Sequence, residues 1–174
     1  DYISEVLGCP ATIEDANHRL LAYSSHETPA DPARLSTIVK RSVPEEVIAY
    51  LWNRGILQQL QQQDTPLRIE AISQIGLGAR TAVAIREQGV VLGYIWVMDE
   101  QQQMEEAKLE LLMNAARTAK EIMLRRRAET VRRFLRPEEF WRLLFHGYFD
   151  NDFQIRQHAS RLQLILPEQM RVVL

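Results

Sequence analysis

The sequence predicts an α+β fold: an antiparallel sheet flanked by helices, then a long helix and a short, mostly helical C-terminal portion. The sheet is indicated by residues 79–99, which read as two strands joined by a tight turn at Gln88-Gly89. The long helix is indicated by residues 104–135, which contain no glycine or proline. An apolar content of 46% with 25% charged residues is typical of a folded domain.

The hairpin at 79–99 is informative about what covers the sheet. Its second strand, 90–98, is apolar on both faces, which is typical of a central strand covered from both sides. In the first strand, Ala82 and Ala84 share one face with Arg80, so this face carries small side chains. A thin face leaves room for a closely packed helix or for a small molecule, and both interpretations stay open.

The residues before this hairpin predict a second hairpin, a group of helices and one more strand. Asp31 followed by Pro32 is typical of a helix N-cap and first helical position. Pro44 is expected to begin another helix in the same way, ending at Gly55. The ranges that we expect are a hairpin at 10–25, helices beginning at 32, 44 and 56, a strand at 67–71 and a loop at 72–78.

The apolar spacing of the long helix changes phase midway. The first, alanine-rich seam allows the helix to lie close against the sheet. The second seam faces another direction, and the same seam from a second chain is the simplest partner for it. The alternative is a long helix packed within one compact domain. The first seam contains Leu109, Leu112, Ala116, Ala119 and Met123, and the predicted homodimer interface contains Leu124, Ala128, Val131 and Leu135.

The net charge and the single cysteine limit which partners and which cellular compartment we expect. The formal net charge of −2 gives the whole chain no signature of nucleic-acid or membrane binding. The arginines between 125 and 136 alternate with acidic and apolar residues, which favours a solvated helix face over a nucleic-acid footprint. The single Cys9 suits a reducing compartment, and the apolar run 89–98 is too short to span a bilayer. We therefore expect a cytoplasmic protein.

No catalytic constellation is found. The four histidines and Cys9 lack the spacing of a zinc site, and no glycine loop of the phosphate-binding kind is present. Glu14 and Asp15 alternate along a strand, so they point to opposite faces and are interpreted as structural. The chain is predicted not to be an enzyme and to hold no metal or cofactor.

A small-molecule site is predicted between the thin sheet face and the helices that precede it. Arg80 stands at the start of its strand, where a guanidinium can hold a carboxylate with two hydrogen bonds. The alternative is that Arg80 pairs with an internal acid such as Glu70. The predicted ligand-binding residues are Arg80, Arg34, Tyr50, Tyr94 and Trp96.

Several stretches together resemble bacterial transcription regulators of the purine-catabolism (PucR) and sugar-diacid (CdaR) type. PATIEDANHRLLAYSS and the segments 34–44, 78–83 and 92–97 look like the GAF-like sensor domain of these proteins. The segment from FWRLLFHGYFDNDF to the final residue is similar to the opening of their degenerate GGDEF-like domain. The resemblance implies a GAF-like sensor domain at 1–103, a linker and dimerisation helix at 104–136, and a truncated GGDEF-like domain at 137–174.

The resemblance also implies a function. It implies a homodimeric regulator that responds to a small metabolite and binds DNA only through a C-terminal helix-turn-helix that this chain lacks. We therefore expect a fragment with ligand-sensing and dimerisation roles and no cyclase activity. The alternative is a GAF-like scaffold module whose cavity is filled by its own side chains.

Overall fold

The computed structural model describes residues 2–24, 31–99, 104–134, 136–146 and 152–167. The chain divides into two compact units, residues 1–122 and 123–174, and each is described by itself. Helix α5, Glu106–Phe134, begins in the first unit and ends in the second. No helix among the described residues is long and apolar enough to cross a membrane.

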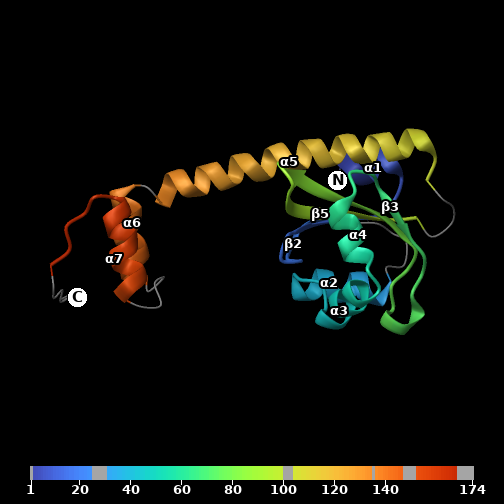
Figure 1. Ribbon diagram of the computed structural model, residues 1–174, viewed down its shortest axis with the longest axis horizontal. Helices are drawn as coiled ribbons and strands as arrows, with labels where there is room; N and C mark the ends of the chain where they lie inside the picture. Colours follow the sequence, from blue (N-terminus) through green and yellow to red (C-terminus); the bar gives the residue numbers. More distant parts are fainter. Residues whose placement is uncertain (1, 25–30, 100–103, 135, 147–151, 168–174) are drawn as a thin grey trace. The chain divides into compact units, whose positions relative to one another are not determined.

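The first unit is built on one antiparallel sheet (Figure 1), which confirms the predicted α+β class. The strand order is β2-β1-β5-β4-β3, so β5 is central, as its two apolar faces predicted. The strands are β1 Ala11–Asp15, β2 Leu20–Tyr23, β3 Leu67–Ile69, β4 Arg80–Glu87 and β5 Val90–Met98.

The β4–β5 turn fixes which side chains share a face. Gln88 and Gly89 both have positive φ, 48° and 81°, which is the conformation of a two-residue hairpin turn of the I′ type. In the resulting register Ala82 pairs with Trp96, and Trp96 pairs with Thr12 of β1. These three side chains therefore lie on the same face of the sheet.

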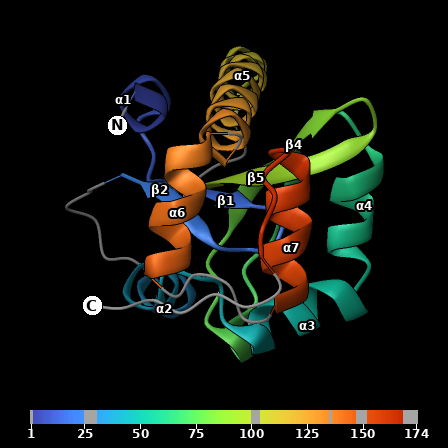
Figure 2. The same ribbon diagram turned by 90° about the vertical axis from the view of Figure 1, so that its left-hand side faces the viewer.

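Helices cover both faces of the sheet. The helices between β2 and β3 cover the face that carries Trp96, whereas α1 and α5 lie over the other face (Figures 1 and 2). The helices between β2 and β3 pack a continuous apolar core against this face, including Leu51, Leu57 and Leu60. The first-unit helices besides α5 are α1 Tyr2–Leu7, α2 Pro32–Lys40, α3 Glu45–Asn53, α4 Ile56–Gln62 and the 3-10 turn η1 Ser73–Ile75.

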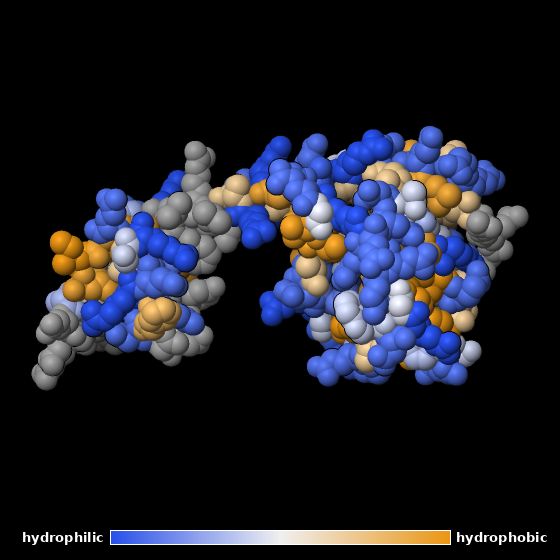
Figure 3. Space-filling view, viewed as in Figure 1, coloured by the Kyte–Doolittle hydropathy of each residue, from blue (hydrophilic) through white to orange (hydrophobic). Residues whose placement is uncertain are grey.

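The α5 side of the sheet is mostly apolar, with one buried polar cluster in which Asp99 pairs with Arg68 and accepts a hydrogen bond from Thr81. Val83 and Ile95 point to this side and are buried. The alanine-rich seam of α5 is confirmed as a buried stripe, because its members Leu112, Ala116 and Ala119 are all buried. The surface that the first unit presents in Figure 3 is mostly hydrophilic, with apolar side chains showing in patches.

The start of α2 is held by a close approach of the η1 loop. Gly76 has φ +59°, and a Cβ placed on it would lie 2.9 Å from Cβ of Pro32, so only glycine fits there. The Gly76 carbonyl accepts a hydrogen bond from the backbone N–H of Ala33 at 3.1 Å. Asp31 is the N-cap of α2 and Pro32 its first residue, as predicted.

Two local expectations were wrong. Pro44 is the N-cap of α3 and not its first helical residue, because its ψ of 139° is extended. The strand expected at 67–71 ends at Ile69, where its pairing with Arg80 ends.

The second unit contains the end of α5 and two short helices, α6 Pro137–Phe145 and α7 Asp152–Arg161. Phe140 is buried between them, stacked on His158 with ring centroids 6.0 Å apart. In the predicted dimer seam Leu124 is half-buried and Ala128 exposed. Leu135 lies outside the described residues, as does the side chain of Val131.

Candidate functional site

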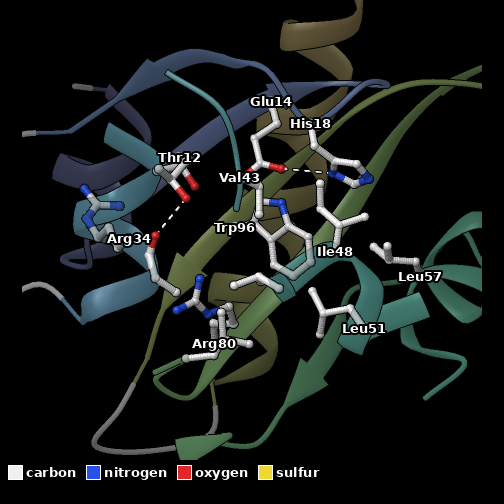
Figure 4. Close-up of a pocket in the computed structure, with 14 residues that line it drawn as sticks. Thr12, Glu14, His18, Arg34, Val43, Ile48, Leu51, Leu57, Arg80 and Trp96 are labelled. Carbon is white, nitrogen blue, oxygen red and sulfur yellow. Dashed lines mark hydrogen bonds and ion pairs between the residues drawn. The ribbon is translucent and has the colours of Figure 1, made fainter. Parts of the chain in front are cut away.

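A cavity in the first unit lies between the Trp96 face of the sheet and helices α2, α3 and α4 (Figure 4). The space open to the centre of a water molecule is about 20 Å³, enough for about one water. The helix side is apolar at α3 and α4, with Ile48, Leu51 and Leu57. The polar residues that line the cavity are Thr12, Glu14, His18, Arg34, Thr37 and Arg80.

A buried carboxylate joins the start of α2 to the start of β4. Oδ1 of Asp31 accepts a hydrogen bond from the backbone N–H of Arg34 at 2.7 Å. Oδ2 accepts one from the backbone N–H of Gly78 at 2.9 Å and forms an ion pair with the Arg80 guanidinium. Arg80 also donates from Nε to the Gly78 carbonyl at 3.0 Å. Asp31 thus combines helix capping with charge compensation.

Arg34 brings a second guanidinium to the same place. Arg34 and Arg80 are only 5% and 6% exposed. The described part of the chain gives the Arg34 guanidinium one hydrogen bond, from Nη2 to the carbonyl of Ser24 at 2.8 Å. Burial lowers the pKa of Arg34, and the charge of Arg80 lowers it further. Among the described residues Asp31 pairs with Arg80, and none forms an ion pair with Arg34.

Glu14 and His18 form the other polar end of the cavity. Glu14 is 4% exposed, and its Oε2 lies 3.4 Å from Nδ1 of His18. Burial raises the pKa of the Glu14 carboxyl, and the contact with His18 opposes this rise only in part. The His18 ring is stacked on Tyr94, with centroids 5.1 Å apart and planes at 5°.

Trp96 lies between the two polar ends (Figure 4). Its side chain is buried, and among the described residues its Nε1–H has no hydrogen-bond partner. The indole is near enough to Glu14 to lower the pKa of that carboxyl slightly, but the contact falls short of hydrogen-bond geometry. A buried donor without a partner is unusual in a folded protein and is suited to a bound acceptor.

The cavity brings together three of the five predicted site residues: Arg34, Arg80 and Trp96. Tyr94 does not line it, but stacks on His18 and accepts a hydrogen bond from Gln61 at 2.9 Å. Tyr50 lies away from it, with its hydroxyl accepting from Nη2 of Arg54 at 3.1 Å.

Arg80 does pair with an internal acid, as the alternative interpretation held. The acid is Asp31, whereas Glu70 pairs with Arg68 at 3.3 Å.

Sequence reasoning missed three residues of the site. Asp31 was interpreted only as a helix cap, and Glu14 as a structural residue of a strand. His18 was placed in a turn, which is correct, but its left-handed φ of 58° was not anticipated. The available signal was the alternation of Thr12 and Glu14 in β1, which places two polar side chains on one face.

The arrangement has the chemical character of a binding site and lacks that of a catalytic one among the described residues. One end offers guanidinium donors, the other a carboxyl that burial favours in its neutral form, and an apolar wall lies between them. No group of three histidine, cysteine, aspartate or glutamate side chains in the described ranges comes close enough to hold a metal ion.

Comparison with known proteins relates the chain to transcriptional activators. No family model matches it. The chain is 37% identical over 174 residues to the DNA-binding transcriptional activator AdeR of Bacillus subtilis (strain 168), covering all of the chain and 41% of AdeR. It is 27% identical over 175 residues to the proline-responsive transcriptional activator PutR of the same strain, covering 43% of PutR. The chain, which spans less than half the length of either protein, is homologous to part of two transcriptional activators.

Proposed function

We propose that this chain is the ligand-sensing and dimerising part of a cytoplasmic bacterial transcription regulator of the PucR/CdaR type, and not an enzyme. The homology to AdeR and PutR supports this assignment. Because the chain spans less than half of either relative, we assign DNA binding to a helix-turn-helix domain outside it. Residues 1–103 would be the GAF-like sensor, 104–136 the linker helix and 137–174 the beginning of a GGDEF-like domain.

The pair of buried guanidiniums beside Trp96 is the observation that best supports the sensing role. Arg34 keeps donors that no described residue uses, and it faces a cavity with an apolar wall. A few convergent polar groups in an apolar pocket are typical of small-molecule sites. The effector that fits is a metabolite bearing a carboxylate. PutR is described as proline-responsive, and proline bears such a group.

The size of the cavity favours a second candidate function. Space for about one water is far below the several hundred Å³ typical of ligand pockets. An effector would therefore have to move α2 or α3 away from the sheet. If the cavity stays closed, the chain is a dimerisation or scaffold module without a ligand.

Thermal unfolding with a panel of small carboxylates decides between the two functions. We expect at least one carboxylate to raise the Tm of the chain. Arg34→Gln should weaken the binding of that carboxylate at least about tenfold, as expected for the loss of a charged hydrogen bond. Arg54→Gln, on the outside of α3, is the matched control and should bind normally. A panel without any Tm increase would support the scaffold function instead.

The dimerising role is proposed for the second half of α5. The helix has 29 residues and is therefore about 44 Å long. Its last part carries the seam of Leu124, Ala128, Val131 and Leu135, and Ala128 is exposed in the single chain. A second copy of the seam around a two-fold axis would bury it. Movement of α5 on the sheet would then link effector binding to the partner chain.

Light scattering tests the dimer. The double variant Leu124→Glu/Val131→Glu should be monomeric, because four like charges would meet in the seam of a dimer. Arg126→Glu, on the opposite side of the helix, is the matched control and should remain dimeric. A seam variant that stays dimeric would place the interface elsewhere.

A further inference from the structure

Helix α2 forms one wall of the cavity, but it is attached to the first unit differently from α3 and α4. Helices α3 and α4 contribute large side chains to the apolar core, among them Leu51 and Leu57. Of the residues of α2, only Ala33 belongs to this core, whereas Leu35 and Val39 are 52% and 81% exposed. Burial of apolar surface therefore holds α2 less firmly than it holds α3 and α4.

Polar contacts hold both ends of α2. At the N-terminal end, Asp31 accepts a hydrogen bond from the backbone N–H of Gly78 and forms an ion pair with Arg80. At the C-terminal end, the carbonyl of Arg41 accepts a hydrogen bond from the backbone N–H of Leu20 at 2.9 Å. Segments with few buried apolar contacts open more readily than segments packed into a core. Helix α2 is therefore the wall of the cavity that is displaced most easily.

An effector needs such a displacement. The space for about one water is too small for any organic carboxylate. Arg34 of α2 and Arg80 of β4 both line the cavity (Figure 4). Asp31 already places a carboxylate on Arg80. An effector carboxylate that approaches Arg80 therefore competes with the carboxylate that holds the start of α2.

We propose that α2 is the lid of this cavity and that the Asp31 carboxylate is its latch. In the closed state, Asp31 ties the lid to the start of β4 through Arg80 and Gly78. An effector carboxylate takes the place of Asp31 at Arg80, so that effector binding and release of the lid occur together. This inference rests on the proposed sensing function and adds the conformational step to it.

Asp31 then has two opposing effects. It stabilises the closed chain, because it caps α2 and pairs with Arg80. It also weakens effector binding, because a site that binds only when open loses affinity in proportion to the fraction of open molecules. A purely structural role predicts the reverse, since loss of Asp31 would disorganise the site and weaken binding. The sign of the change in affinity separates the two roles.

The first test is the Asp31→Asn variant of the 174-residue chain. The probes are acetate, pyruvate, lactate, succinate and benzoate, with affinities measured by calorimetry. We expect at least one probe to bind Asp31→Asn at least about fivefold more tightly than it binds the natural chain, because more molecules are open. Asp64→Asn is the matched control: its acid pairs with Arg86 and is 87% exposed at its side chain. This control should bind the probes like the natural chain.

Gly76→Ala separates release of the lid from removal of a charge. A Cβ on Gly76 would lie 2.9 Å from Cβ of Pro32, so this variant pushes the start of α2 away without changing any charge. We expect it to bind the same probe at least about threefold more tightly than the natural chain. Gly55→Ala is the control, because Gly55 also has a positive φ, of 75°, but a Cβ there meets nothing within 4 Å.

Hydrogen exchange followed by mass spectrometry tests the lid itself. Without any probe, amides of α2 should exchange at least about tenfold faster than amides of α3, and faster still in Asp31→Asn and Gly76→Ala. Equal exchange in the two helices would overturn the lid.

The binding measurements also separate failure of the latch from failure of the sensing function. If a probe binds the natural chain and neither variant binds it more tightly, the latch fails and the sensing function stands. Tighter binding by Asp31→Asn alone would assign the effect to its charge and overturn the lid. A probe that binds only the two variants would support both proposals. If no probe binds the natural chain or either variant, both fail.

Discussion

The two faces of the sheet in the first unit are built from different chemistry, although they alternate along the same strands. Towards α5, β4 and β5 present buried apolar side chains such as Val83 and Ile95, and the polar cluster of Thr81, Asp99 and Arg68 lies only near the start of β4. Towards α2–α4, the same strands present Arg80 and Trp96, and β1 adds Glu14. Successive side chains along a strand point to opposite faces of the sheet. An apolar side chain on the α5 face is therefore followed directly by a side chain on the cavity face.

The difference predicts which face contributes more to the stability of the first unit. Burial of apolar surface stabilises a fold by about 25 cal/mol per Å². Burial of charge costs free energy unless it is paired, and even a well-paired buried ion pair is often no better than an apolar replacement. The charged side chains under α2 and α3 are thus expected to add little to stability, which agrees with the binding role that we propose for them.

Removal of Asp31 is expected to have the largest effect on this comparison. Asp31→Ala removes an ion-pair partner of Arg80 and the N-cap of α2 together. The loss should be about 3–5 kcal/mol, which is typical when a buried charge loses its partner. Urea unfolding measures it. Asp31→Asn keeps the cap acceptor and should cost less, so equal losses for the two variants would contradict the role of the charge.

The matched change on the apolar face is Leu112→Ala in α5. Leu112 is fully buried against the sheet, so the cavity left behind should cost about 2–4 kcal/mol. Urea unfolding measures the loss of stability. Because Leu112 lies on the other side of the sheet, binding of any carboxylate effector by the folded variant should not change. A selective loss of binding would mean that the two faces are not independent.

Much of the fold could be predicted because its signals are local. Asp31-Pro32 identifies the start of α2 without any tertiary information. The Gln88-Gly89 turn and the apolar run of β5 likewise identified the central hairpin. The alanine-rich seam of α5 was readable because close packing on a sheet requires small residues at a helical period.

The site could be predicted only in part, because its geometry depends on residues that are distant in the sequence. Arg80 and Arg34 stood out as charges at positions expected to face a cavity. The partner of Arg80 could not be predicted, because Asp31 reaches it only through the approach of the Gly76 loop to α2. The raised pKa of Glu14 follows from burial under helices, which alternation along β1 alone does not reveal.

The smallest expected effect is a difference in pH dependence between the two acids Glu14 and Glu70. Burial raises the folded-state pKa of Glu14 above its ordinary value of 4.5, which the unfolded chain retains. The stabilising contribution of Glu14 is therefore fully present below about pH 4.5 and is lost as the pH rises through the folded-state pKa. Between these two values the unfolding free energy should fall by at most about 1.4 kcal/mol per pH unit.

Glu14→Gln removes this titration, so its stability relative to the natural chain should rise with pH across that window. Urea unfolding at a series of pH values, without ligand, measures the difference. Glu70→Gln, whose acid is exposed, should keep the slope of the natural chain. If Glu14→Gln and the natural chain ran parallel, Glu14 would be ionised in the folded state at neutral pH. The two polar ends of the cavity would then carry charges of opposite sign.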